Sequence, residues 1–245
     1  MSRRNKNKIK YYYDSHFTAK DLTGQPSLHS ALIGYLGQVI EWLFREQAYV
    51  LHQNLNFYYT PDPQEYPMEP DIAVIKGISK PEMYSWKVGK SGPAPHVVFE
   101  IASYHTWRED IDEKVEIYGH MGVQEYFAYD PYRPPVWEGI SRRLLGWRLD
   151  QKTQTLHTIQ LNPDGSLWSH HLESFLVPDG SYLRLHDKQG HKRLTASEYY
   201  SARADTLRAE TDAPIERWKA QDAVRHKIQI YKDKLRSLGV DPDSI

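Results

Sequence analysis

Cysteine is absent from the 245 residues of this chain. Its absence excludes disulfide bonds, zinc sites built from thiolates and catalysis by a cysteine nucleophile. No apolar run approaches the length of a membrane span, and the basic N-terminus leads into tyrosines and an aspartate, where a secretion signal would have an apolar core. These absences lead us to expect a cytoplasmic protein.

A strong charge of one sign is missing as well, because 31 Lys and Arg residues nearly balance 32 Asp and Glu residues. The net charge of -1 argues against a uniformly basic nucleic-acid-binding protein and leaves a local basic surface open. The histidines form no HExxH pattern, and the chain has no Walker loop, no GxGxxG and no nucleophile elbow. The protein classes that these motifs define are therefore not indicated.

One stretch of the chain predicts a strand, a helix and a second strand in succession. Val97–Ile101 is a nearly continuous apolar run, which suits a strand that is covered on both faces. Thr106 and Glu109 have the spacing of a capping box, which marks the start of a helix, and Gly122 can end that helix in the left-handed conformation. Residues 125–129, which are apolar or aromatic after Glu125, then predict the second strand of a strand–helix–strand unit.

A carboxylate interrupts the first of these strands. Glu100 lies among apolar neighbours, where burial of a charged carboxylate is costly unless a cation or a strong donor meets it. Asp110 and Lys114 lie one turn apart on the following helix, so Lys114 could face the same site as Glu100. The alternative is that Asp110 and Lys114 form a surface ion pair, which would contribute about 0.2–0.5 kcal/mol.

The remainder of the first 190 residues predicts a mixed α/β fold. Apolar spacing predicts a helix over residues 28–46 and a strand over residues 55–59. A second buried strand follows Asp71, and Lys76–Pro95, which contains several Gly and Pro residues, is typical of an exposed loop. Short alternating segments predict an antiparallel extension of the sheet, at residues 144–149, 156–161, 172–176 and 182–185.

Both ends of the chain differ from this core. The basic tail at residues 1–13 is either a solvated tail or an arm that contacts phosphates. Helical patterning returns after Thr195, and Pro214 should divide it into two pieces. This C-terminal segment carries nine basic and nine acidic residues, which suits a docking or dimerising helix better than a nucleic-acid-binding arm. We therefore expect a core domain at residues 1–190 and a helical appendage at residues 191–245.

Two acids stand at the ends of strands whose other residues are apolar. If these strands are neighbours, Asp71 and Glu100 converge, and their repulsion would raise the pKa of one carboxyl group unless a hard cation neutralised the pair. Oxygen ligands without sulfur suit Mg²⁺, and a nearby lysine can orient water or stabilise charge on phosphorus. Together these groups would serve phosphodiester hydrolysis. The alternative is that both acids are turn formers or solvated groups.

Residues spread over the central part of the chain form one pattern. Its members are Pro70-Asp71, Glu100-Ile101-Ala102-Ser103, Thr106, Asp110, Lys114, Tyr118, Gly122-Val123, Glu125-Tyr126 and Asp130-Pro131. This pattern resembles the Uma-type restriction endonuclease family, which belongs to the PD-(D/E)XK nuclease superfamily. The resemblance implies a restriction-endonuclease-like α/β fold, in which helices flank a mixed β-sheet core, with an antiparallel extension and a C-terminal helical tail.

The resemblance also implies a metal site and an activity. Asp71 and Glu100 would ligate Mg²⁺, with Mn²⁺ as an alternative, and the backbone carbonyl of Ile101 would be a third ligand. The expected activity is metal-dependent cleavage of DNA by an endonuclease, in which water attacks phosphorus. A homodimer formed through the C-terminal helices is expected, because cutting two strands is easier with two sites.

The lysine of this site would come from an unusual position. The superfamily usually carries it two residues after the second acid, where this chain has Ala102. By resemblance to the Uma-type family, Lys114 on the following helix would take over this role. Asp110 would then hold Lys114 in place or support the start of the helix, and Ser103 matches a serine of the family.

Two rival hypotheses remain open. A protein with this fold could bind DNA or RNA without cleaving it, or it could serve assembly through its C-terminal helices. The intact set of Asp71, Glu100 and Lys114 favours the enzyme.

Overall fold

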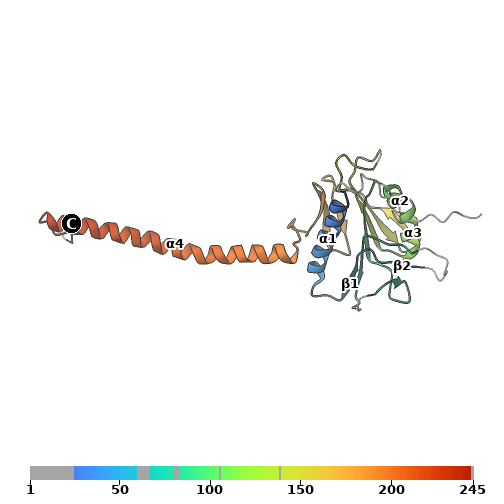
Figure 1. Cartoon of the computed structure of the whole chain (residues 1–245), viewed down its shortest axis with the longest axis horizontal. Helices are drawn as coiled ribbons and strands as arrows, with labels where there is room; N and C mark the ends of the chain where they lie inside the picture. The colour runs from blue at the N-terminus through green and yellow to red at the C-terminus, as the bar shows by residue number, and fades with distance from the viewer. Residues whose placement is uncertain (1–24, 60–66, 80–82, 105, 138, 244–245) are drawn as a thin grey trace, which may run out of the picture. The chain divides into compact units, whose positions relative to one another are not determined.

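The chain divides into two compact units, Met1–Thr195 and Ala196–Ile245. The structure is a computed structural model, and it describes residues 25–59, 67–79, 83–104, 106–137 and 139–243 (Figure 1). The predicted basic tail at residues 1–13 lies outside the described residues. Within the described part of the chain, no helix is long and apolar enough to cross a lipid bilayer.

A six-stranded mixed sheet forms the centre of the first unit, as the sequence predicts. Its strand order is β1-β3-β5-β6-β7-β8; β5 and β6 are parallel, and the other neighbours in this sheet are antiparallel. The strands are β1 (Tyr49–His52), β3 (Ile72–Lys76), β5 (Val97–Ile101), β6 (Glu125–Tyr129), β7 (Leu144–Asp150) and β8 (Thr155–Thr158).

Both faces of this sheet are covered, which explains why its central strands are apolar at nearly every position. Side chains alternate along β5, so Phe99 packs on the same side as α1, whereas Val98 and Glu100 face the opposite side, where α3 lies. The first face carries α1 (Gln25–Phe44) and a three-stranded sheet of β9 (Leu167–Ser169), β10 (Ser174–Asp179) and β11 (Tyr182–His186). The second face carries α2 (Trp107–Ile111), α3 (Glu113–Met121) and the parallel pair of β2 (Phe57–Tyr58) and β4 (Trp86–Lys87) (Figure 1).

The predicted antiparallel strands are present, but the strand pattern differs from the prediction in two details. The expected antiparallel extension is divided, because β7 and β8 extend the main sheet whereas β9, β10 and β11 form a sheet of their own. The segment Lys76–Pro95 is not simply an exposed loop, because Trp86 on β4 is fully buried and its ring lies 6.3 Å from that of Phe57. Burial of these two aromatic rings folds a segment rich in Gly and Pro back onto the domain.

The connection between β5 and β6 confirms the predicted crossover but differs in its details. The helix is interrupted at Asp112, which separates α2 from α3. The predicted capping box is wrong, because the Thr106 side chain makes no cap hydrogen bond. Its hydroxyl instead lies 2.8 Å from that of Ser103, whose oxygen also accepts the Thr106 N–H. Gly122 ends α3 in the left-handed conformation, with φ 88°, as predicted.

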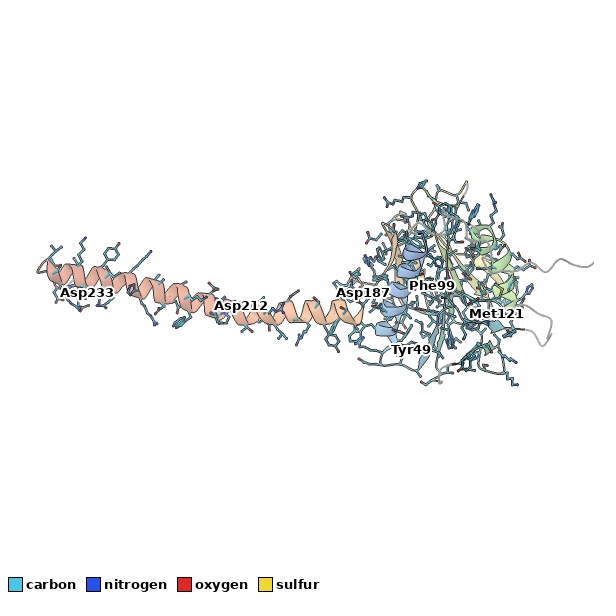
Figure 2. The ribbon with its side chains drawn as sticks, viewed as in Figure 1. Tyr49, Phe99, Met121, Asp187, Asp212 and Asp233 are labelled. Atoms are coloured by element: carbon cyan, nitrogen blue, oxygen red, sulfur yellow. The ribbon has the colours of Figure 1, made fainter. Side chains whose placement is uncertain are left out.

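The second unit consists mainly of one helix, α4 (Ala196–Ser237), of 42 residues. The predicted division at Pro214 is wrong, because α4 continues through the proline. The loss of one backbone donor is local, and residues that favour helix are abundant on both sides, Ala, Arg and Glu before the proline and Ala, Arg and Lys after it. None of the residues of α4 is buried, and Figure 2 shows its side chains projecting from the ribbon, among them Asp212 and Asp233.

Candidate functional site

Asp71 immediately precedes β3, and Glu100 lies on β5, the antiparallel neighbour of β3. The ladder between these strands ends with Ile72 opposite Phe99, so Asp71 and Glu100 are the residues next to its last pair. The Asp71 carboxylate reaches across to β5, where it accepts the backbone N–H of Ile101. The fold therefore brings together two site residues that are 29 positions apart in the sequence.

Helix α3 places a lysine against these acids. Lys114 Nζ lies 3.0 Å from Glu100 Oε1 and 2.7 Å from Asp110 Oδ1, and the three side chains are only 13%, 4% and 2% exposed. Tyr118, one turn further along α3, donates its hydroxyl to the same Glu100 Oε1. Because residues four apart share a helix face, α3 presents an ammonium and a phenol together. Asp71, Glu100 and Asp110 are called the acid cluster below.

Two other buried acids, Glu125 and Asp130, show how this protein stabilises a carboxylate that has a structural role. Glu125 pairs with Arg148 and accepts two backbone N–H groups, at His170 and His171. Asp130 accepts hydrogen bonds from three backbone N–H groups. In the acid cluster, by contrast, Glu100 and Asp110 share the ammonium of Lys114, the one lysine or arginine that pairs with the cluster among the described residues. Asp71 lies beside His29 and accepts the Ile101 N–H. The carboxyl groups of the cluster therefore outnumber its lysine and arginine partners.

The pKa shifts at the cluster follow from this crowding. Burial raises the pKa of Glu100 to about 8, because the effect of Lys114, which lowers it, is smaller, and Asp71 and Asp110 raise it further. Burial likewise raises the pKa of Asp110. Burial alone would lower the pKa of Lys114, but its contacts with Glu100 and Asp110 outweigh that effect and raise it. Lys114 is therefore an ammonium at neutral pH.

A histidine that the sequence does not single out lies next to Asp71. Asp71 Oδ2 accepts the backbone N–H of Ile101 at 2.6 Å, and His29 Nε2 on α1 lies 3.3 Å from the same carboxylate oxygen. The same nitrogen lies 3.1 Å from the carbonyl oxygen of Ile101. Burial lowers the pKa of His29, but hydrogen bonding to Asp71 and the negative charge of the site outweigh it and raise the pKa above its ordinary value. No motif or spacing links His29 to the acids.

Two tyrosines pack against each other beside the acid cluster. The rings of Tyr118 and Tyr126 lie 4.9 Å apart, and Tyr126 donates its hydroxyl to the backbone carbonyl of Asp110. The position of Tyr118 at four residues after Lys114 is a sequence signal that could have identified it. Ser103, predicted as a supporting residue, forms its described hydrogen bonds with Thr106 at the start of α2.

The donors in this region fit a hard divalent cation. Asp71, Glu100 and the Ile101 carbonyl offer oxygen atoms at one end of the β3–β5 pair, and Asp110 Oδ2 is buried without a hydrogen-bond partner among the described residues. In this part of the chain, no group of three or more His, Cys, Asp or Glu side chains is arranged to hold a metal. A metal would therefore need backbone, water or substrate ligands as well, which is usual for Mg²⁺.

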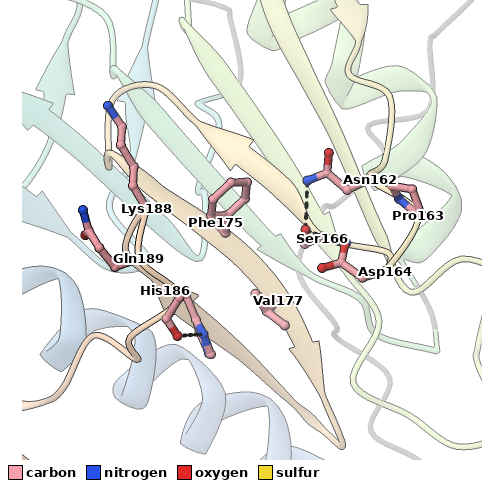
Figure 3. Close-up of a pocket in the computed structure, with 10 residues that line it drawn as sticks. Asn162, Pro163, Asp164, Ser166, Phe175, Val177, His186, Lys188 and Gln189 are labelled. Atoms are coloured by element: carbon pink, nitrogen blue, oxygen red, sulfur yellow. Dashed lines mark hydrogen bonds between the residues drawn. The ribbon is translucent and has the colours of Figure 1, made fainter.

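A surface hollow of about 690 Å³ is lined by residues of the segment 162–166, of β10 and of the segment 186–190 (Figure 3). Its lining includes Phe175, which alternates along β10 with the fully buried Leu176 and therefore faces outward from the three-stranded sheet. Its one lining acid, Asp164, accepts the N–H and hydroxyl of Ser166. None of the residues that line the hollow belongs to the acid cluster, so it is a separate surface feature.

These features define a restriction-endonuclease-like α/β protein, with an acid pair on two neighbouring strands and a lysine on the crossover helix. A family model described as "Putative restriction endonuclease", Uma2, matches residues 4–185. The chain therefore belongs to the Uma2 family, and the resemblance noted in its sequence is confirmed.

Comparisons with curated proteins and with solved structures give less information about function than the family match. No curated protein matches the chain. One similar solved structure is described as "a putative nuclease belonging to DUF820" from Anabaena variabilis ATCC 29413. The two sequences are 16% identical, the match covers 59% of this chain and 73% of that chain, and the TM-score is 0.41. The family match is therefore the finding that indicates a nuclease-like function.

Proposed function

We propose that this protein is a Mg²⁺-dependent endodeoxyribonuclease, with Mn²⁺ as an alternative ion, and that it acts on DNA in the cytoplasm as a homodimer. Membership of the Uma2 family supports the nuclease-like part of this proposal. Residues 1–190 would form the nuclease-like domain, and residues 191–245 would form a helical appendage.

The charge of the acid cluster carries the proposal. Its buried carboxyl groups have the one ammonium of Lys114, which contacts Glu100 and Asp110, although the same fold satisfies Glu125 with an arginine and Asp130 with three N–H groups. A buried carboxylate without a counter-charge costs several kcal/mol (order of magnitude), and burial accordingly raises the pKa of Glu100 to about 8. A divalent cation would take the place of the proton on Glu100 and favour an anionic substrate at the same place.

The residues of the chain would have distinct roles. Asp71, Glu100 and the Ile101 carbonyl would hold the ion, which would supply stabilisation of phosphate charge and lower the pKa of water. Lys114 stays protonated because its pKa is raised, so it would not accept a proton from the attacking water. Its ammonium would instead donate to a phosphate oxygen and stabilise the negative charge that develops as water attacks phosphorus.

Asp110 and Tyr118 would be positioning residues. Asp110 holds Lys114 from the end of α2, 2.7 Å from Nζ, and Tyr118 holds Glu100 from α3. Both Tyr118 and Lys114 contact Glu100 Oε1. Glu100 Oε2 takes part in neither contact, and it is the oxygen that we assign to the ion.

Nicking of supercoiled plasmid DNA by the purified full-length chain tests this function. We expect cleavage that requires Mg²⁺ or Mn²⁺ and stops when EDTA is added. Asp71→Ala and Glu100→Ala should each abolish it, because each removes an oxygen ligand. Glu116→Ala is the matched control, since Glu116 is an exposed acid on α3 and should leave the rate unchanged.

The outcomes of this assay separate the alternatives. Retained cleavage in a folded Asp71→Ala or Glu100→Ala variant would remove that acid from the mechanism. If the wild-type chain binds DNA in a gel-shift assay but does not cut it with either ion, the non-catalytic nucleic-acid-binding function is correct instead.

One observation favours an assembly function in addition. Val224, Ile228, Tyr231 and Leu235 on α4, and Leu238 just after its end, follow each other at spacings of four and three, and four of them are at least 50% exposed. This is the apolar stripe of a helix that packs against another helix. Because the segment from Thr195 onward carries equal numbers of acidic and basic residues, a second copy of α4 would meet no net charge repulsion. We assign this stripe to the homodimer.

A further inference from the structure

His29 is in contact with two of the three groups that would hold the ion. Its Nε2 atom lies 3.3 Å from Asp71 Oδ2 and 3.1 Å from the carbonyl oxygen of Ile101. The ring therefore lies where a ligand of the same ion would be, on the α1 side of the acid cluster.

The sequence of α1 fixes this position. Leu32 and Leu36, three and seven residues after His29, are fully buried against the main sheet. These spacings place the two leucines on the same face of α1 as His29, so their burial directs the imidazole toward the sheet. The His29 side chain remains 27% exposed, and that of Asp71 12%, so an ion can reach the nitrogen from solvent.

The distances match the edges of a coordination shell. Neighbouring ligands of an octahedral ion lie √2 times the metal–ligand distance apart, which is about 2.8–3.0 Å for Mg²⁺. The observed 3.1 Å and 3.3 Å are contact distances between Nε2 and its two oxygen neighbours and are close to these edges. An ion could therefore take the place of the proton that Nε2 shares with its oxygen neighbours.

We propose that His29 Nε2 is a ligand of the divalent ion, next to Asp71 Oδ2 and the Ile101 carbonyl, and that it makes the site select Mn²⁺ over Mg²⁺. This inference rests on the proposed metal-dependent function and adds a nitrogen ligand to its oxygen ligands. Imidazole favours first-row transition ions, whereas Mg²⁺ is bound almost entirely by oxygen. His29 would thus determine which ion occupies the site.

A purely orienting role for His29 makes a different prediction. In that case Nε2–H donates a hydrogen bond that holds Asp71 or the Ile101 carbonyl, and it never meets the ion. The variant His29→Gln separates the two roles, because its amide N–H can still donate while the imidazole nitrogen is lost. His120→Gln is the matched control, since His120 is exposed on α3.

Two measurements on the full-length chain test the proposal without using cleavage. Electron spin echo spectroscopy of the Mn²⁺-loaded chain should show coupling to ¹⁴N, and this coupling should change to that of ¹⁵N when histidine is labelled with ¹⁵N. Calorimetric titration should show that His29→Gln binds Mn²⁺ roughly tenfold more weakly, or weaker still. Its affinity for Mg²⁺ should change less than roughly threefold, because Mg²⁺ gains little from a nitrogen ligand.

Each result has a distinct meaning. Mn²⁺ bound to the wild-type chain without nitrogen coupling would overturn the assignment of His29 and leave the oxygen site standing. Equal weakening of both ions in His29→Gln would also overturn it and would show an orienting role. Mn²⁺ binding that is unchanged by Asp71→Ala would instead show that the proposed metal site is wrong. The labelling experiment uses the wild-type sequence, so it remains decisive if His29→Gln does not fold.

Discussion

Glu100 is the residue whose ionisation has opposite effects on the stability of the fold and on the proposed function. Its burial raises its pKa to about 8, so the metal-free site holds it mainly protonated at neutral pH. Binding of a cation would require the carboxylate form, and the ion would supply the charge that the surroundings lack. The same group that destabilises the empty site at high pH would thus become a ligand when the ion binds.

We therefore predict that the metal-free protein loses stability as pH rises from about 4.5 to about 8, relative to the variant Glu100→Gln. Within this range the unfolded chain has released the Glu100 proton and the folded chain retains it. Unfolding then releases a proton, and higher pH favours the unfolded state. Urea unfolding in EDTA, at several pH values in this window, measures the effect.

The glutamine variant provides the reference because it cannot titrate at this position. Profiles of the two chains that run parallel from about pH 4.5 to about pH 8 would show that Glu100 is already ionised in the folded protein. Addition of Mn²⁺ should reverse the loss in the wild-type chain and should have little effect on the variant.

The sequence identifies some of the clustered residues better than others. Asp71 and Glu100 stand out because each carboxylate accompanies an apolar strand, and Lys114 follows from its helical spacing to Asp110. His29 has no such signal, because it reaches Asp71 through the packing of α1 on the sheet, a long-range contact that periodicity does not encode. Tyr118 resembles an ordinary core residue, since its hydroxyl partner belongs to a different element.

At the scale of elements, Lys114 and Tyr118 lie on one face of α3, and the break at Asp112 separates α3 from the short helix α2. Periodicity predicted the crossover and its glycine end correctly, because both depend on local sequence. It did not predict the break at Asp112, where φ is -117° and ψ is -82°, or the continuity of α4 through Pro214. Both depend on a small free-energy balance at a single residue, which a pattern averaged over several turns does not resolve.

For α3 we predict that Lys114→Ala lowers the rate of DNA cleavage by roughly 10²–10³-fold, which is typical of the loss of one group that stabilises transition-state charge. The affinity for the divalent ion should be unchanged or tighter, because Lys114 is no ligand and its removal leaves the acid cluster more negative. Single-turnover cleavage and calorimetric titration measure the two quantities separately.

The variant Lys114→Arg tests whether charge alone is sufficient. It keeps the positive charge but changes its shape, so partial recovery of the rate is expected. Loss of ion binding in Lys114→Ala, together with a lower melting temperature, would assign Lys114 a structural role in place of an electrostatic one.

At the scale of the whole molecule, the two units have different kinds of surface. The first unit buries apolar residues on both faces of its main sheet, whereas α4 has no buried residue along its 42 positions. A helix whose own apolar stripe is uncovered gains stability by packing against a second helix. This difference supports catalysis in the first unit and self-association through the second.

We predict that the full-length chain is a dimer and that a chain ending at Thr195 is a monomer, as measured by light scattering coupled to size-exclusion chromatography. A full-length chain with Ile228→Lys and Tyr231→Lys should also be monomeric, because the charges interrupt the apolar stripe. The control Ala223→Lys adds charge at an exposed position of the same helix outside this stripe and should leave the dimer intact. A truncated chain that remains dimeric would place the interface in the first unit.

The pairing of Ile72 with Phe99 determines which substitutions and insertions would separate Asp71 from Glu100. Main-chain ladder bonds, and not the volumes of neighbouring side chains, set the separation of the two acids, so the surrounding core can be repacked while the carboxylates stay in place. Lengthening the connection after β3 would leave them adjacent. A single residue inserted within β3 would turn Asp71 to the opposite face and separate the pair.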